Sequence, residues 1–381
     1  MSSSSIPTAV MSFPTRMIVG PGALSQLADE VRTLGAQRAL IVSDEGLVKA
    51  GVVARVQAAL DEGKIGHALY TSISKNPKER DVLDGVEAYL ASGAALVIGL
   101  GGGAAMDVAK LIRLKVTHPL PLEDYDDTQG GSELITEPQP PMIAVPTTAG
   151  TGSEVGRAGV VSLGPKGRKV VIFAPSMLPE VALCDAELTV GLPAPITAAT
   201  GIDALTHAIE AYVGQGSHPL ADAIALASIA RVGGYLAAAV HDGTDLRARH
   251  EMMVAASMGA IAFQKNLGAC HALAHPLSSV CDLHHGLANA LMLPHVIRFN
   301  TPVVAARYDD VATALGAQRD CASVVTDLIE QVGLPTRLRD VGVKRRHFKP
   351  MVAQAIVDAS APGNPRELTA EHARELYEAA F

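Results

Sequence analysis

The sequence predicts an α/β N-terminal domain built on a parallel sheet, followed by an all-α C-terminal domain. In the first part of the chain, short apolar runs rich in Val, Ile and Leu alternate with amphipathic segments of helical periodicity. From about Pro195 onward the chain is rich in Ala and Leu, keeps a helical periodicity and shows almost no strand pattern. A length of 381 residues also exceeds what one hydrophobic core ordinarily supports. We therefore expect domains at residues 1–192 and 193–381, with the boundary near Leu192.

The expected strands of the first domain are apolar on both faces, as in sheets covered by helices on both sides. They are separated by amphipathic segments at residues 46–63 and 79–93, which predicts βαβ units. One segment breaks this rhythm, because two β-rich runs within residues 159–175 flank a Gly-Pro-Lys-Gly turn and predict a hairpin. The four strands of the parallel sheet are expected at residues 38–44, 67–73, 94–100 and 141–146.

The second domain is expected to consist of long helices. The first of them begins near Pro195, a residue type suited to a first helical turn. Further helical patterns cover residues 219–240, 247–263 and 321–333.

Composition narrows the class of protein. A net charge of −8 and a pI near 5.9 argue against a nucleic-acid partner, which requires clustered Lys and Arg. The serine-rich start lacks the pattern of a signal peptide and is expected to be a short tail, and no continuous apolar run reaches the roughly 18 residues of a membrane span. Four scattered cysteines suit a reducing, cytoplasmic compartment. With only 18% charged residues, much surface should be buried, so we expect a homodimer or higher homo-oligomer.

A glycine run between a predicted strand and a predicted helix resembles a phosphate-binding loop. Residues 97–110 read VIGLGGGAAMDVAK, and glycines there would let backbone amides approach a pyrophosphate at a helix N-terminus. A plain tight turn is the alternative, because no clean strand follows to carry the usual acidic residue about 20 positions downstream. The residues expected to contact the cofactor are Gly101, Gly102, Gly103 and Ala104, and we include Asp107 from the helix that follows.

Two further features favour dinucleotide binding. Asp44 ends a predicted strand, where its carboxylate could bind an adenosine ribose and repel a 2′-phosphate, although a helix N-cap would use the same residue type. A second small-residue loop, PTTAGTGSE at residues 146–154, directly follows another strand. Its hydroxyl side chains expected at the cofactor are those of Thr147, Thr148 and Thr151.

The helical half carries a metal-ligand pattern. Asp203 and His207 lie four residues apart and share one face of a predicted, largely apolar helix. A buried carboxylate needs a compensating cation. Within residues 271–286 the chain adds four more histidines, two of them also four residues apart: His271, His275, His284 and His285.

One Asp and three His form a donor set suited to Fe(II), Zn(II) or a similar ion. The spacing alone does not tell which three of the five histidines would be ligands. The alternative is a set of buried histidines bonded to backbone carbonyls, with Asp203 paired to Lys or Arg.

Four segments together resemble the iron-containing (group III) alcohol dehydrogenase family, in the family's order and over nearly the whole chain. They are GGGAAMDVAK, PTTAGTGSEV, GIDALTHAIEAY and HALAHPLSSVCDLHHGLANALMLPHV. The resemblance implies a Rossmann-like N-terminal domain and an all-helical, metal-binding C-terminal domain, a dehydroquinate synthase-like architecture with the site in the cleft between them. The chain departs from the family where Ala104 and Ala105 replace the usual Ser and Pro, and where Gly156 and Arg157 follow the second loop in place of the common Thr.

The resemblance also implies roles for individual residues. It makes His275 the non-ligand histidine beside the nicotinamide, which we take as the candidate proton relay, and it gives His284 no role. It makes Asp44 the acid that favours NAD over NADP, and it adds Asn76 and Lys169 to the cofactor contacts. The implied metal ligands are Asp203, His207, His271 and His285.

The function implied is an NAD(H)-dependent, metal-dependent interconversion of an alcohol and an aldehyde, with Fe(II) expected and Zn(II) as the alternative ion. Lys265, six residues before His271, and Arg157 could hold a carboxylate, which favours a short semialdehyde acid as substrate over the alternatives of a plain short alcohol or diol. Both residues could equally be solvated surface charges. A dehydroquinate synthase-like lyase, which should carry more Lys and Arg, is the second enzyme class.

Overall fold

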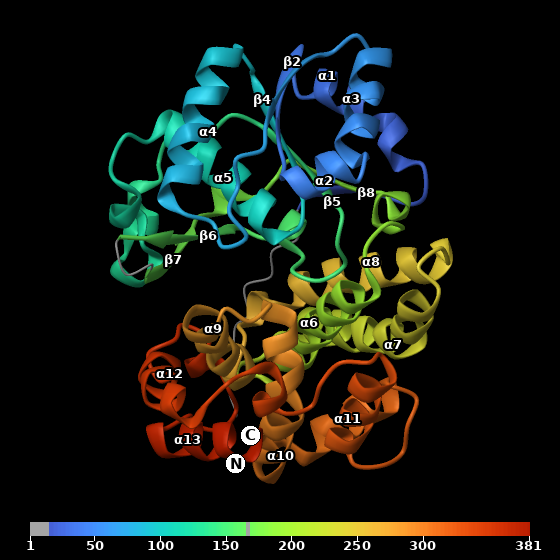
Figure 1. Ribbon diagram of the computed structural model, residues 1–381, viewed down its shortest axis with the longest axis vertical. Coiled ribbons are helices and arrows are strands. Elements are labelled where there is room, and N and C mark those ends of the chain that lie inside the picture. The colour runs from blue at the N-terminus through green and yellow to red at the C-terminus, as the bar shows by residue number, and fades with distance from the viewer. Residues whose placement is uncertain (1–14, 165–167) are drawn as a thin grey trace, which may run out of the picture. The chain divides into compact units, whose positions relative to one another are not determined.

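The computed structural model describes residues 15–164 and 168–381, and these residues form two compact units (Figure 1). One unit contains the described residues up to Leu192 together with Gly243–Met253. The other contains Pro193–Asp242 and Val254–Phe381. The serine-rich start and the central turn residues 165–167 of the predicted hairpin lie outside the described residues.

The first unit is built on a six-stranded sheet in which every neighbouring pair is parallel, in the order β1-β8-β5-β4-β2-β3. All four predicted strands are present. The sequence reading missed two strands of four residues each, which are too short to show a pattern of their own. The strands are β1 (Arg16–Val19), β2 (Arg38–Val42), β3 (Gly66–Tyr70), β4 (Leu96–Gly101), β5 (Met142–Pro146) and β8 (Val181–Cys184), of which β1 and β8 were missed.

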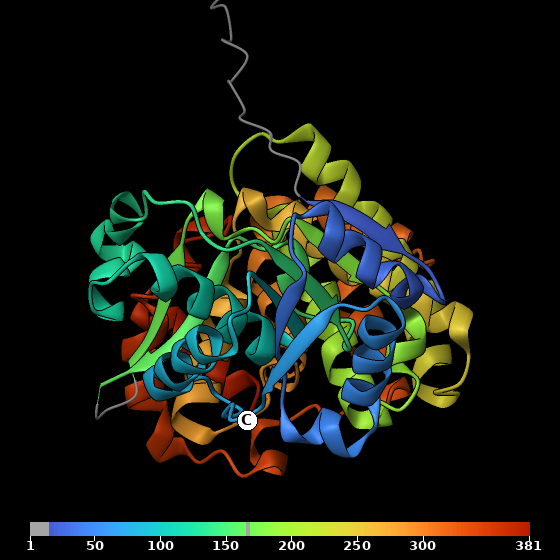
Figure 2. The same ribbon diagram turned by 90° about the horizontal axis from the view of Figure 1, so that it is seen from above.

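Helices cover both faces of this sheet, as the doubly apolar strands predict (Figures 1 and 2). Along β4, Leu96, Ile98 and Leu100 pack in one hydrophobic cluster, whereas Val97 packs in the cluster on the opposite face. The first cluster includes residues of α1 (Leu27–Thr33) and α3 (Val52–Glu62), and the second includes residues of α4 (Glu79–Ser92) and α5 (Gly103–Thr117).

Two local features complete the first unit. The amphipathic segment at residues 46–63 forms two helices rather than one, α2 (Glu45–Lys49) and α3, because Gly51 adopts a left-handed conformation with φ of 76°. The predicted hairpin is present as β6 (Ala158–Leu163) and β7 (Arg168–Phe173), which pair antiparallel.

The second unit is helical, which together with the sheet unit confirms the predicted fold class. Helix α6 packs against α7 and α10, and α9 packs against α10 and α12. By length and composition alone α7 could cross a membrane, a property that core helices of water-soluble proteins share. The helices from this part of the chain are α6 (Ala194–Val213), α7 (Pro219–His241), α8 (Leu246–Ala262), α9 (Ala269–Cys281), α10 (His285–Ala314), α11 (Cys321–Gln331), α12 (Phe348–Ala355) and α13 (Ala370–Ala379).

Helix α6 is the buried centre of this unit, since every residue from Thr197 to Val213 is buried. The first turn of helix α10 packs against it at Gly286, the second residue of α10. A Cβ atom on Gly286 would lie 2.1 Å from the carbonyl oxygen of Ala199 and 3.3 Å from the Cβ of Asp203. The approach of α10 to the α6 turn that carries Asp203 therefore requires glycine at this position.

We predict that Gly286→Ala destabilises the protein by about 1–3 kcal/mol, the usual cost of overpacking a tight contact. The matched control is Gly234→Ala in α7, where a Cβ would meet nothing within 4 Å. That change should be neutral or stabilise by up to about 1 kcal/mol, because alanine loses less backbone entropy in a helix. Urea denaturation of both variants measures the difference, and equal stability of the two would contradict the packing constraint.

Candidate metal centre

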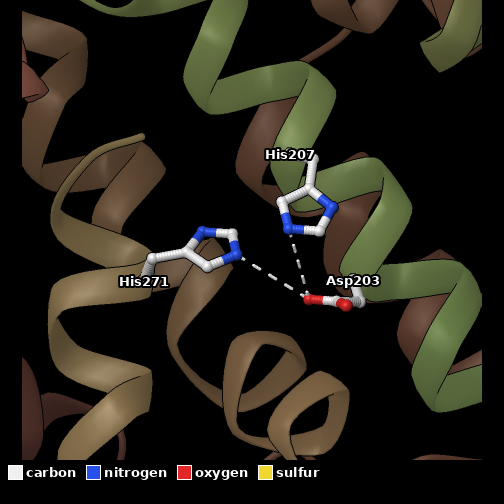
Figure 3. Close-up of side chains that lie close together, drawn as sticks. All are labelled: Asp203, His207 and His271. Atoms are coloured by element: carbon white, nitrogen blue, oxygen red, sulfur yellow. Dashed lines mark ion pairs between the residues drawn. The ribbon is translucent and has the colours of Figure 1, made fainter. Parts of the chain in front are cut away.

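Asp203 and His207 lie one turn apart on α6, His271 lies on α9, and His285 is the first residue of α10. All three helices belong to the same unit. Figure 3 shows His207 and His271 reaching the Asp203 carboxylate from two different helices. The Asp203 Oδ1 atom lies 3.9 Å from His207 Nε2, 3.7 Å from His271 Nε2 and 3.4 Å from His285 Nε2. The structure thus brings together the four residues that the family resemblance implies as ligands.

These spacings fit a metal ion. Bonds of about 2.0–2.2 Å to nitrogen and oxygen would separate ligand atoms by about 3.3–3.6 Å in a tetrahedral arrangement. Asp203, His207 and His271 are buried, and one ligand atom of each lies within 4.8 Å of the others. Three imidazoles and one carboxylate are the donors that Fe(II) and Zn(II) accept. The alternative in which Asp203 pairs with Lys or Arg is wrong, because its described ion-pair partners are histidines.

The electrostatics of the cluster are those of a site that binds a cation. Burial opposes the ionisation of Asp203, but His207, His285 and His271 outweigh it and hold the pKa of Asp203 well below its ordinary value. Burial also opposes protonation of His271, yet the nearby Asp203 carboxylate and the hydrogen bond with Glu210 raise the pKa of His271 to about 9. The negative charge of Asp203 and Glu210 is thus compensated in part by a proton on His271, and a divalent cation would displace that proton.

Glu210, which the sequence reading did not single out, holds His271 in place. Its Oε2 lies 2.6 Å from His271 Nδ1, so Nε2 of the ring is left to face Asp203. Glu210 lies seven residues after Asp203 on the same face of α6, and this helical spacing was the available sequence signal.

The N-terminus of α9 is fixed by the same carboxylate. Its N-cap is Gly268, whose missing side chain leaves the first helical amides without a local acceptor. The Cys270 amide donates to Glu210 Oε1 at 2.6 Å, and the Ala269 amide donates to Asn364 Oδ1 at 3.1 Å. A Cβ on Gly268 would lie 2.9 Å from that Glu210 oxygen. Glycine is needed there because two side chains occupy the space.

Asn289 is a second residue that the sequence reading missed. Its Nδ2 donates to Asp203 Oδ1 at 2.7 Å and lies 3.3 Å from both His271 Nε2 and His285 Nε2. It is fully buried on α10, one turn after His285. The amide therefore orients the carboxylate against the histidines from the third helix.

His275 and His284 differ from the four clustered residues. The His275 ring stacks on that of His285, with centroids 5.3 Å apart and planes at 14°, and its Nδ1 lies 2.7 Å from Asp358 Oδ2. His275 therefore lies next to the four clustered residues, but its Nδ1 is bonded to Asp358 and not to any of them. His284 is exposed at the N-cap of α10 and makes no side-chain cap.

The two loops predicted to hold a dinucleotide lie against each other at the ends of the neighbouring strands β4 and β5. The Thr147 amide donates to the Gly101 carbonyl at 3.0 Å. A Cβ on Gly102 would lie 3.3 Å from Thr148 Oγ1, and one on Gly103 would lie 3.0 Å from Thr151 Cγ2. Gly101, Gly102, Gly103 and Ala104 form the end of β4 and the beginning of α5, as a phosphate-binding turn requires.

Of the other predicted cofactor residues of this unit, Asp44 lies beside the glycine turn, whereas Asn76 and Lys169 lie on other segments. Asp44 is the N-cap of α2, where Oδ1 accepts the Leu47 amide at 3.1 Å, and its Oδ2 lies 3.8 Å from the Cβ position of Gly101. Asn76 is exposed in the segment between β3 and α4, and Lys169 lies on β7 near Asp107. Asp44 therefore caps α2 with one oxygen, and its second oxygen faces the glycine turn, so the ribose contact stays a prediction.

Comparisons with known proteins match this chain at family level over most of its length. Residues 14–186 match iron-containing alcohol dehydrogenase, and residues 197–381 match the C-terminal part of the Fe-containing alcohol dehydrogenase family. The chain belongs to the iron-containing alcohol dehydrogenase family.

Individual members of the family align end to end with this one. It is 39% identical to a 4-hydroxybutyrate dehydrogenase of Cupriavidus necator, covering 97% of this chain and 99% of that protein. The crystal structure of a 1,3-propanediol oxidoreductase superposes with a TM-score of 0.93 at 36% identity, covering 98% and 100% of the two chains. A sulfoacetaldehyde reductase from Bifidobacterium kashiwanohense, solved in complex with NAD+, superposes with a TM-score of 0.88 at 28% identity over 98% and 100%.

This alcohol dehydrogenase is accordingly an NAD-dependent, metal-containing oxidoreductase that acts on alcohols and aldehydes, with iron and NAD(H) as its cofactors. The predicted activity class is confirmed, and the lyase alternative is not supported.

Asp107, which is predicted to contact the cofactor, has hydrogen-bond donors for its carboxylate within the protein. The Asp107 carboxylate accepts from Ser153 Oγ at 2.9 Å and from the Val160 amide at 3.3 Å, and burial raises its pKa to about 6. Lys110, one turn later, is buried and donates to Ser153 Oγ, Ser153 O and Ala158 O at 2.7–3.0 Å. Asp107 therefore ties α5 to the second loop and to β6, and its role as a direct cofactor contact stays a prediction.

Lys265, predicted to hold a substrate carboxylate, is also engaged elsewhere. Its ammonium lies 2.8 Å from Asp222 Oδ1 and 3.1 Å from the Tyr212 carbonyl, and Arg307 binds the other oxygen of Asp222 at 2.6 Å. With only 3% of its side chain exposed, Lys265 is a buried structural ion-pair partner, so both the substrate role and the alternative of a solvated charge are wrong.

Arg157, the other predicted substrate residue, is half-buried between the second loop and β6. Its predicted role in binding a substrate anion stays a prediction.

We predict that Glu210→Gln weakens metal binding by about 10- to 100-fold, the usual effect of losing a partner that orients a ligand histidine. Glutamine has one acceptor oxygen in place of two, so either the His271 ring or the Cys270 amide loses its partner. The matched control is Glu330→Gln, which makes the same charge change at an exposed position of α11. Competition with a chromogenic chelator measures the dissociation constant, and equal values for wild type and Glu210→Gln would overturn the assignment.

Proposed function

We propose that the two predicted domains of the dehydrogenase, residues 1–192 and 193–381, bind different cofactors. The first would hold NAD(H) at the glycine turn and the threonine loop, with Asp44 at the adenosine ribose and with Asn76 and Lys169 as further contacts. The second would hold the divalent ion through Asp203, His207, His271 and His285. The observation that carries the proposal is the convergence of one buried carboxylate and three imidazoles from three helices.

In the proposed mechanism a bound ion would supply Lewis acidity at the substrate oxygen, and a bound nicotinamide would supply the hydride chemistry at the substrate carbon. Asp203 and the three histidines would hold the ion, and Glu210 and Asn289 orient those side chains through their hydrogen bonds. His275 would pass the proton of the alcohol hydroxyl to solvent, or return it in the direction of reduction.

For the substrate, we propose a short semialdehyde acid and its ω-hydroxy acid, with a plain short alcohol or diol as the second candidate. The names of two similar proteins, 4-hydroxybutyrate dehydrogenase and sulfoacetaldehyde reductase, both describe substrates that carry an anionic group. The half-buried Arg157 guanidinium is the residue of this chain proposed to bind that anion. Similarity to a 1,3-propanediol oxidoreductase supports the second candidate.

We further propose a cytoplasmic homodimer or higher homo-oligomer without nucleic-acid or membrane partners. The support is the net charge of −8 and the four cysteines, all of which are free.

Asp203→Ala or His271→Ala should remove the ion and abolish turnover while leaving NADH affinity within about twofold of wild type, because the proposed dinucleotide contacts lie on the other unit. Metal analysis and NADH fluorescence titration under anaerobic conditions check both parts. A loss of NADH binding as large as the loss of metal would contradict the proposed division.

Replacing Asp44 should narrow the preference for NAD(H) over NADP(H). Asp44→Ser keeps an N-cap oxygen for α2 but removes the charge, so it separates cofactor selection from helix stability. We expect the ratio of kcat/KM for NADH to that for NADPH to fall by about tenfold or more, the value of one charge-assisted hydrogen bond. An unchanged ratio in a stably folded Asp44→Ser variant would remove Asp44 from cofactor selection.

Arg157→Gln should lower kcat/KM for succinate semialdehyde by about tenfold or more and leave butanal within about twofold, because only the acid loses a charge-assisted hydrogen bond. Lys265→Met is the comparison: its ammonium already binds Asp222, so any loss should fall equally on both aldehydes. A wild type that prefers butanal, or equal losses in Arg157→Gln, would leave the short alcohol or diol as the substrate.

A further inference from the structure

Helix α9 carries two histidines that are each bound at Nδ1 by a carboxylate. His271 is bound by Glu210 at 2.6 Å, and His275, one turn later, is bound by Asp358 at 2.7 Å. The first pair orients a proposed metal ligand. The second pair has no such purpose, because the proposed ligand set does not include His275.

Asp358 lies between α12 and the short helix Ala361–Gly363, and both of its oxygens are engaged. Oδ2 faces the His275 ring, and Oδ1 accepts the Ser360 amide at 2.9 Å. Its side chain is 17% exposed, against 35% for that of His275. The carboxylate is therefore held from its own loop and presents one fixed oxygen to the imidazole.

Two contacts together determine the orientation of the His275 ring. Stacking on His285 sets the plane of the ring, and the Asp358 bond decides which edge faces the loop. Because an ionised carboxylate only accepts hydrogen bonds, the ring proton is placed on Nδ1 and Nε2 remains on the opposite edge.

We propose that Asp358 is a positioning residue that fixes His275 as the Nδ1–H tautomer, with Nε2 turned to the reacting hydroxyl. This rests on the proposed role of His275 as the proton relay. A carboxylate that binds Nδ1–H fixes the ring, so that Nε2 is the nitrogen left without a proton and able to accept one. The proton then passes from Nε2 to solvent, and the ring returns to its starting form.

A purely structural role for Asp358, as a tether between the α12 loop and α9, is the competing explanation. The two helices already have such a tether, because Ser279 Oγ donates to Gln354 Oε1 at 2.7 Å. Loss of the His275–Asp358 hydrogen bond should therefore change the tautomer and orientation of the His275 ring while the packing of α9 against α12 is kept.

The test compares Asp358→Ala with Asp358→Asn, whose amide oxygen still accepts from Nδ1–H. Asp320→Ala is the matched control, since it removes a carboxylate that accepts an amide at 2.8 Å at the N-terminus of α11. In Asp358→Ala we expect kcat to fall by about 10- to 100-fold with metal content and NADH affinity unchanged. Asp358→Asn should recover to within about threefold of wild type, and Asp320→Ala should keep wild-type kcat.

Nitrogen NMR of histidine-labelled, metal-free protein reads the tautomer directly, with the His275 signal identified by its absence in His275→Gln. The proposal expects Nδ1–H in wild type and Asp358→Asn, and a shift toward Nε2–H in Asp358→Ala. An unchanged tautomer, an equal loss of kcat in Asp320→Ala, or no rescue by Asn would overturn it. If His275→Gln turns over like wild type, the relay itself is wrong, whereas the tautomer result still decides whether Asp358 positions the ring.

Discussion

The burial of one carboxylate, that of Asp203, is the constraint on which the rest of the helical unit depends. It lies on a helix whose residues are buried from Thr197 to Val213, so its charge must be compensated within the protein. Imidazoles on α6, α9 and α10 surround it, and that of His271 carries the compensating proton, so the three helices have to meet at this point. Glycine makes the approach of α10 to α6 possible at Gly286, where a Cβ would lie 2.1 Å from the Ala199 carbonyl oxygen. Gly259 likewise lets α8 pack against α6, since a Cβ there would lie 3.0 Å from the Ala204 carbonyl oxygen.

A second layer of hydrogen bonds keeps the imidazoles facing inward. Glu210 serves both the His271 ring and an amide of the first turn of α9, so the same carboxylate orients a side chain and anchors the helix that carries it. Asn289 reaches Asp203 from α10. Such partners act by reducing the freedom of the metal-binding groups before a metal arrives, which is why their loss is expected to affect metal affinity more than overall stability. In the sheet unit Asp107 and Lys110 similarly tie α5 to the loop that follows β5.

Features that depend on residues close together in the chain could be predicted from the sequence, whereas contacts between residues far apart in the chain could not. Helical spacing placed Asp203 and His207 on one face, and the apolar strands predicted a sheet covered on both sides. Residue spacing alone could not tell which three of the five histidines would be metal ligands. The family resemblance implied His207, His271 and His285. Glu210 was within reach of the same helical argument, but Asp358, 83 residues after His275, has no periodic relation to it. Lys265 was misjudged because its partner Asp222 lies 43 residues away on another helix, and a sequence does not show which buried charges will meet.

We propose that one carboxylate and three imidazoles, with no thiolate, form the metal centre. X-ray absorption spectroscopy of the iron-loaded protein, prepared without oxygen, identifies the atoms bound to the metal. We expect only nitrogen and oxygen neighbours at about 2.0–2.2 Å, with the outer-shell scattering of three imidazole rings, and the loss of one ring's contribution in His285→Ala. A sulfur neighbour at about 2.3 Å, which the adjacent Cys270 could supply, or a spectrum unchanged in His285→Ala, would contradict it.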